Sequence, residues 1–327
     1  MERRAAAGLG AAVLLLAALP APLALAHGSA PPAPSDLWTA WSLEPLVLLG
    51  LALAAGAYAW GLAALWRRVG AGRGVSYGQA AAFAGGIVAL VLALVSPLDA
   101  LSAALFAAHM TQHLLLIQVA APLLVAGAPL VPSLWALPAP WRRALGRAWR
   151  RAPPAAWRTL TAPLLVWALH AGALWAWHLP GLYQAALADE RVHALEHACL
   201  LGSALLFWWV LPWPGRHGRL GYGTGVLYVL LMTAQSSALG ILLAFARAPW
   251  YPAYASAEAA WGIAPLDDQQ VAGLIMWVPS AFLYLGAVLG LLAAWSRAAE
   301  RPARAGPAAP APTGSAAPAR PRRGAPA

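Results

Sequence analysis

The sequence predicts an all-α membrane protein, a polytopic bundle of about seven transmembrane helices, and three observations support this. Hydrophobic residues make up 61% of the 327 residues and charged residues only 10%, well under the roughly 25% charge of a soluble domain. The apolar residues form runs long enough to cross a hydrocarbon core of roughly 30 Å as helices. The basic residues, all of them arginine, gather in the segments between alternate runs.

The N-terminal segment has the features of a secretory signal peptide. Arg3 and Arg4 precede a short apolar stretch that ends in Ala24-Leu25-Ala26, a small-residue pattern typical of a cleavage site. We therefore expect residues 1–26 to be removed, or else to remain as an extra helix. Residues 27–42 would then form a short segment outside the membrane.

Seven further apolar runs define a transmembrane domain over residues 43–295. The runs are approximately Leu43–Trp66, Gly78–Pro97, Leu101–Ala126, Thr161–His178, Val192–Leu211, Tyr222–Ala246 and Gln269–Trp295. Their internal Pro and Gly residues are tolerable because neighbouring helices can satisfy the freed backbone groups. Residues 296–327 are rich in Pro, Ala and Arg, so we expect them to form a disordered basic tail.

The arginines predict the orientation. The segments that would lie outside carry only Arg191 and Arg247, whereas the remaining arginines between and after the seven runs fall on the opposite side. An excess of Arg on the cytoplasmic side is the rule for membrane proteins. We therefore expect a multi-pass protein of the cell's inner (plasma) membrane with its N-terminus outside, after signal cleavage, and its C-terminus inside.

The net charge of +10 does not indicate nucleic-acid binding. Such binding would need a basic groove interleaved with stacking aromatic residues, and the arginines here do not form one. The basic segment from Pro140 to Arg151 could be an interfacial helix on the anionic inner leaflet, or a solvated loop that only sets topology. Both readings remain open.

Most of the histidines fall in the outer part of the predicted bundle. His109 and His113 lie on the third span, His178 ends the fourth, and His193 and His197 begin the fifth. The pairs four residues apart lie on one helix face, roughly 6 Å apart. Ionisable groups within a membrane are costly and are read first as functional.

The chemistry of these groups favours a metal. Neutral imidazole is the commonest metal ligand, and imidazole with a thioether suits copper. Met276 of the seventh span falls at the same level, and Gln112 shares a face with His109. Glu196 could accept a hydrogen bond from a metal-binding imidazole and so orient it, or it could pair with Arg191.

Three other polar residues allow two readings each. His170 lies two turns deeper than His178 and could be a supporting ligand or simply a hydrogen bond to a neighbouring helix. Asp99 and Asp268 fall at the predicted outer mouth, where they could attract a cation or cap helices at the interface.

The same residues bear on three other metal functions. A single haem between a histidine of the third span and one of the fifth remains possible, but residues four apart cannot serve two stacked haems. A membrane di-iron enzyme would need more histidines, usually in denser clusters. A copper transporter would need ligands continuing toward the inner side, where only Met232, Gln235 and His170 are candidates.

Five motifs in order carry a resemblance to a known family. They are Ser96-Pro97-Leu98-Asp99, His109-Met110-x-Gln112-His113-Leu114, Trp177-His178-Leu179-Pro180-x-x-Tyr183, His193-x-x-Glu196-His197 and Asp268-Gln269-x-x-Ala272-Gly273-x-x-Met276-Trp277. Over roughly Leu43 to Trp295 the chain resembles the cytochrome c oxidase assembly factor CtaG, the multi-helix family associated with caa-type oxidases.

The resemblance implies a non-enzymatic metallochaperone of the respiratory chain that helps mature cytochrome c oxidase by supplying copper. Carried over by position, the copper residues would be His109, His113, His178, His193, His197 and Met276. Because this site would lie within the outer part of the bilayer, we expect it to serve the buried copper of oxidase subunit I. Copper would arrive as Cu(I) from an extracytoplasmic carrier protein and pass sideways to the oxidase subunits.

Overall fold

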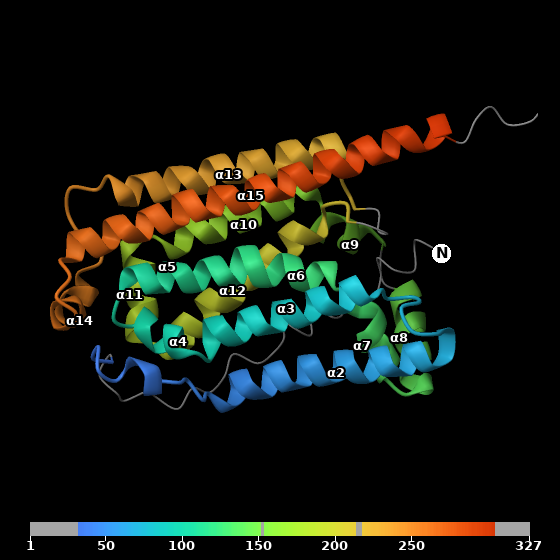
Figure 1. Ribbon diagram of the computed structural model, residues 1–327, viewed down its shortest axis with the longest axis horizontal. Coiled ribbons are helices and arrows are strands. Elements are labelled where there is room, and N and C mark those ends of the chain that lie inside the picture. Colours follow the sequence, from blue (N-terminus) through green and yellow to red (C-terminus); the bar gives the residue numbers. More distant parts are fainter. Residues whose placement is uncertain (1–31, 152–153, 214–217, 305–327) are drawn as a thin grey trace, which may run out of the picture.

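A computed structural model describes residues 32–151, 154–213 and 218–304 of the chain (Figure 1). The described residues form helices joined by short connections, with no strand in these ranges. The long helices lie side by side along one axis. The predicted signal segment and the end of the predicted tail, residues 305–327, lie outside the described residues.

Helical structure coincides with each of the predicted runs. In chain order it consists of α2 (Pro45–Val69), α3 (Tyr77–Leu94), α5 (Phe106–Leu114) continuing through the π-helix η2 (Leu115–Ala120) into α6 (Ala121–Ala126), α10 (Pro163–Trp177), α12 (Glu190–Trp209), α13 (Tyr222–Ala244) and α15 (Pro265–Arg304).

Five of these stretches are long and apolar enough to cross a membrane, so a multi-pass helical bundle is confirmed, whereas the count of seven is not. α10 is apolar but has only 15 residues. α12 is long enough, but its first turns carry His193, Glu196 and His197, which lower its mean hydropathy. The polar residues that make α12 interesting are thus the ones that weaken it as a membrane span.

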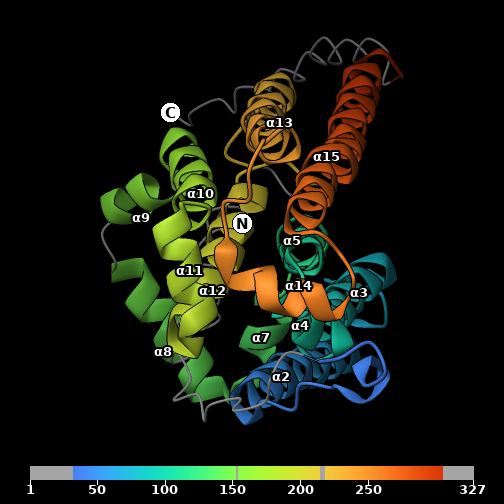
Figure 2. The same cartoon turned by 90° about the vertical axis from the view of Figure 1, so that its left-hand side faces the viewer.

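Each end of the bundle carries a different set of short helices. The end predicted to face outside carries α4 (Pro97–Ser102), α11 (Pro180–Ala188), the short 3-10 helix η3 (Pro252–Tyr254) and α14 (Ala255–Ala260). Figure 2 looks onto this end and shows α14 lying across it. The opposite end carries α7 (Leu130–Ala136), α8 (Ala139–Arg151) and α9 (Pro154–Leu160).

The basic segment at the opposite end is a helix rather than a loop. It forms α8, and the Arg142 guanidinium lies 4.3 Å from the ring centroid of Trp135 on α7. An arginine over an aromatic face is a favourable cation–π contact. This contact ties the basic helix back to the bundle.

The paired helices α13 and α15 touch through their backbones. A Cβ added to Gly273 of α15 would lie 2.4 Å from the amide nitrogen of Ala244 and 2.6 Å from the carbonyl oxygen of Gly240, both on α13. Small residues at such crossings allow membrane helices to approach closely. α15 continues past Trp295 to Arg304, so residues 296–304 of the predicted disordered tail are helical.

Candidate metal centre

Histidines from α5 and α12 meet at the end of the bundle predicted to face outside. The rings of His109 and His113 have centroids 4.4 Å apart, and those of His193 and His197 are 4.2 Å apart. Across the two helices, His109 lies 5.2 Å from His193, and His113 lies 5.4 Å from His197. We call these four residues the histidine cluster.

The carboxyl group of Glu196 lies against the same histidines. Its oxygens are 3.7 Å from Nε2 of His109 and 3.7 Å from Nε2 of His113, and its side chain is fully buried. The sequence left open whether Glu196 meets an imidazole or pairs with Arg191, and the structure places it at the imidazoles.

Two sets of donor atoms are close enough to hold a metal ion. Nitrogens of His109, His113 and His197 lie within 4.8 Å of one another, as do donor atoms of His109, His193 and Glu196. Both Glu196 oxygens and Nε2 of His193 and His197 lack a hydrogen-bond partner among the described residues. Buried polar groups are normally paired, and a bound cation would satisfy these atoms. The residues therefore fit a metal ion.

A tyrosine network fixes the proton on His109. The Tyr254 hydroxyl lies 3.1 Å from the Ser102 carbonyl oxygen, 2.8 Å from the Tyr183 hydroxyl and 3.1 Å from Nδ1 of His109. A carbonyl oxygen can only accept, so the single Tyr254 proton goes to Ser102. Tyr183 and His109 must then donate to Tyr254. With its proton on Nδ1, neutral His109 presents the lone pair of Nε2 to the histidine cluster.

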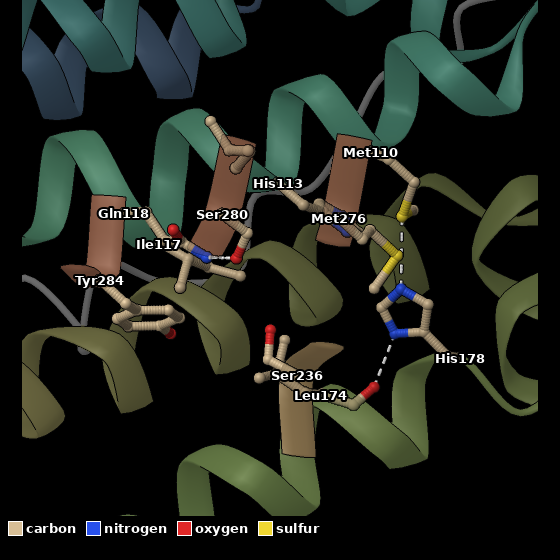
Figure 3. Close-up of a pocket in the computed structure, with 11 residues that line it drawn as sticks. Met110, His113, Ile117, Gln118, Leu174, His178, Ser236, Met276, Ser280 and Tyr284 are labelled. Atoms are coloured by element: carbon tan, nitrogen blue, oxygen red, sulfur yellow. Dashed lines mark hydrogen bonds between the residues drawn. The ribbon is translucent and has the colours of Figure 1, made fainter. Parts of the chain in front are cut away.

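His178 lies beside the histidine cluster and contacts a methionine. Its Nδ1 donates to the Leu174 carbonyl oxygen at 2.6 Å, and its Nε2 lies 3.3 Å from Sδ of Met110. The ring centroids of His178 and His113 are 6.3 Å apart. Met276 lines the same small cavity as these three side chains (Figure 3).

Two predicted site residues contact other parts of the bundle. Nδ1 of His170 lies 2.9 Å from the Ser203 hydroxyl, and its ring packs on Phe207, away from the histidine cluster. Gln112 points from α5 toward α3 and α4, donating to the Ala93 carbonyl at 2.8 Å and to Asp99 at 2.7 Å. Gln112 and Asp99 therefore hold α5 in place.

Asp268 positions α5 as well. Its carboxylate accepts hydrogen bonds from the backbone N–H groups of Phe106 at 2.6 Å and Ala107 at 3.2 Å, the first residues of α5. A carboxylate at a helix N-terminus satisfies orphan donors and complements the helix dipole. Here the capping carboxylate comes from α15, so it also joins the helices that carry His109 and Met276.

The acidic pair at this end includes a residue that sequence reasoning missed. Burial, and next the neighbouring Asp268 carboxyl, raise the pKa of the Glu258 carboxyl on α14 to about 7. Only 2% of Glu258 is exposed. A glutamate between two alanines in a short loop helix gives no sequence signal of such burial.

Other site residues were also missed from the sequence. Tyr251 and Tyr254 fall in a loop between two predicted spans, yet both are buried and contact His178 and His109, respectively. Met110 was not identified because buried methionines are usually core filler. Gln118 and Ser280, which form a hydrogen bond, line the cavity on its deeper side, where the sequence had suggested only Met232, Gln235 and His170.

Comparison with known proteins identifies one family. The sequence profile described as cytochrome c oxidase caa3 assembly factor (Caa3_CtaG) matches residues 56–298. Two similar relatives are the uncharacterized proteins Mb0105 of Mycobacterium bovis and MT0111 of Mycobacterium tuberculosis. Each is 26% identical over 284 residues, which cover 82% of this chain and 41% of the relative. The match thus spans less than half the length of these relatives. No solved structure matches the chain significantly.

Proposed function

The chain belongs to the cytochrome c oxidase caa3 assembly factor family, and on that premise we propose that it binds copper in the histidine cluster and supplies it to the oxidase during assembly. The coarser part of this statement, a multi-pass cell-membrane protein of an oxidase assembly family, follows from the profile and the apolar helices. The copper, its route and its destination are the proposal. An assembly role calls for binding and release rather than for a catalytic residue.

The proposal is carried by the convergence of four imidazoles and one carboxylate, from two helices, at one end of the bundle. Packing alone gives little reason to bury so many unpaired polar atoms, because each costs about 1–3 kcal/mol when left unsatisfied. Imidazole nitrogens bind copper well. His109 presents Nε2 in the protonation state that a metal requires.

The donor arrangement favours transfer over permanent storage. The two candidate donor sets share His109, so an ion held by one set has a neighbouring set within reach. Ligand exchange between overlapping sets lets an ion move without ever becoming fully uncoordinated. This suits a carrier that must give its metal away.

The depth of the site suggests the destination. The histidine cluster is built on α5 and α12, within the helical bundle rather than in an extramembranous domain. We infer that copper arrives as Cu(I) from an extracytoplasmic carrier and passes sideways to the buried copper site of oxidase subunit I.

Metal analysis of the purified protein tests the copper site. We expect wild type to retain copper and a His109→Ala/His113→Ala variant to lose it. His170→Ala is the matched control, because His170 is equally buried in the bundle but bonds Ser203 instead. Equal copper in the double variant and wild type would overturn the assignment.

Deleting the protein tests the destination. The oxidase purified from the deletion strain should lack the buried copper of subunit I, measured by metal analysis and optical spectra of the haem–copper centre. Loss of copper from the extramembranous site alone would refute the inferred destination while leaving copper binding intact.

A further inference from the structure

We propose that Met110 and His178, with Met276, form a second copper position that contains sulfur and prefers a soft monovalent ion. This inference rests on the proposed copper function. It extends that function from one nitrogen-rich site to two adjacent sites of different chemistry.

The ring hydrogen of neutral His178 lies on Nδ1. A neutral imidazole carries one ring hydrogen, and at His178 that hydrogen is used by Nδ1, which donates to the Leu174 carbonyl at 2.6 Å. Nε2 therefore presents a lone pair. The thioether of Met110, 3.3 Å away, has no hydrogen to donate.

The contact between Nε2 of His178 and Sδ of Met110 has no proton to share. Two electron-pair donors face each other with no proton between them, so the contact is not a hydrogen bond. An ion with affinity for both nitrogen and sulfur would turn it into a favourable interaction. Thioether sulfur is a soft ligand that selects Cu(I) among biological metals.

Met110 and His178 are both held in place by their surroundings. Met110 is 1% exposed and His178 is 3% exposed. The backbone of His178 is held from the other side, because the Tyr251 hydroxyl donates to its carbonyl oxygen at 2.7 Å. Both donors are thus positioned by neighbouring groups before any ion arrives, which is what a preorganised site requires.

A small cavity beside Met110 and His178 provides room for an ion and a third donor, Met276. Met110, His178 and His113 line a cavity of about 30 Å³ together with Met276 of α15. A cavity needs only about 10–15 Å³ of such space to hold one water molecule, so a metal ion has room here. Figure 3 shows Met276 entering this cavity from α15, beside Met110 and His178. His113 belongs to the histidine cluster as well, so it connects the two positions.

The competing interpretation is that the methionines only fill space, as buried methionines commonly do. Met232 provides the comparison. It is also fully buried, but its sulfur accepts a hydrogen bond from the Gln235 amide on the same helix. A substitution of Met232 should therefore be silent in metal binding.

Silver and copper binding to the purified full chain tests the inference. Ag(I) serves as a stable, soft substitute for Cu(I), and X-ray absorption of Cu(I)-loaded protein reports sulfur directly. We expect sulfur and nitrogen neighbours in wild type. Met110→Leu/Met276→Leu should lose the sulfur signal and bind Ag(I) at least ~10-fold more weakly, as supporting ligand changes commonly do. Met232→Leu should match wild type.

The outcomes separate this inference from the proposed function. Copper bound by nitrogen alone in wild type would overturn the inference and leave the histidine cluster standing, and this result does not depend on whether any variant folds. A sulfur signal that persists in the double variant would overturn it as well. Wild type that binds no copper would overturn both.

Discussion

Replacing Tyr254 with phenylalanine should weaken copper binding without removing any ligand. The substitution deletes one hydroxyl, which accepts from Nδ1 of His109 and donates to the Ser102 carbonyl. Without it, His109 loses one acceptor for the proton on Nδ1, so the tautomer with its lone pair on Nε2 is less strongly held. Loss of a group that orients a metal-binding histidine typically costs 10–100-fold in affinity. We expect a change of that size for Cu(I), measured by competition with a chromogenic chelator in detergent.

The stability of the protein should fall too, and a control separates the two effects. The Ser102 carbonyl would lose its buried hydrogen bond from Tyr254, which costs about 1–3 kcal/mol when no other donor replaces it. Tyr58 is a matched residue because it is buried and its hydroxyl donates to the Gly127 carbonyl at 2.9 Å, but it contacts no histidine. Tyr58→Phe should lower thermal stability similarly and leave copper affinity unchanged. If Tyr254→Phe binds copper as tightly as wild type, the reasoning from the His109 tautomer is wrong.

Two further predictions concern the elements that hold the site. Gly273→Ala should destabilise the protein by about 1–3 kcal/mol in thermal unfolding, because the new Cβ would lie 2.4 Å from the Ala244 amide nitrogen and force α13 and α15 apart; a melting curve identical to wild type would contradict the close approach. The raised pKa of Glu258, about 7, means that the folded protein binds its proton more tightly than the unfolded chain does. Stability from this group is therefore complete below about pH 4.5 and is lost as pH rises through 7. Melting temperatures of wild type should fall over this range more steeply than those of Glu258→Gln, and parallel slopes would refute the assignment.

The helices and the meeting of the histidine pairs could be predicted because they depend on period and polarity. Each apolar run coincides with a helix, and the spacing of four in His109/His113 and His193/His197 places each pair on one face. The arginine asymmetry placed both pairs near the same end. These signals are local, so a single sequence contains them.

Contacts that depend on tertiary packing could not be predicted from the sequence. Tyr254 lies 145 positions from His109, and nothing in its loop shows that it is buried beneath the cluster. The significance of Met110 depends on which nitrogen of His178 is protonated, and this depends on a hydrogen bond to Leu174. The π-helix that follows His113 also changes the face on which Gln118 falls, so counting in a regular helical period fails there.

The shortness of α10 has a consequence for the membrane around it. A helix of 15 residues is about 22 Å long, less than a hydrocarbon core of roughly 30 Å. Such hydrophobic mismatch is relieved when the bilayer thins locally. α10 ends at Trp177, and His178 and Leu179 connect it to α11. Lipid headgroups and water should therefore lie closer to His178 on this flank. A docking protein would meet a thinner hydrocarbon core there than elsewhere around the bundle.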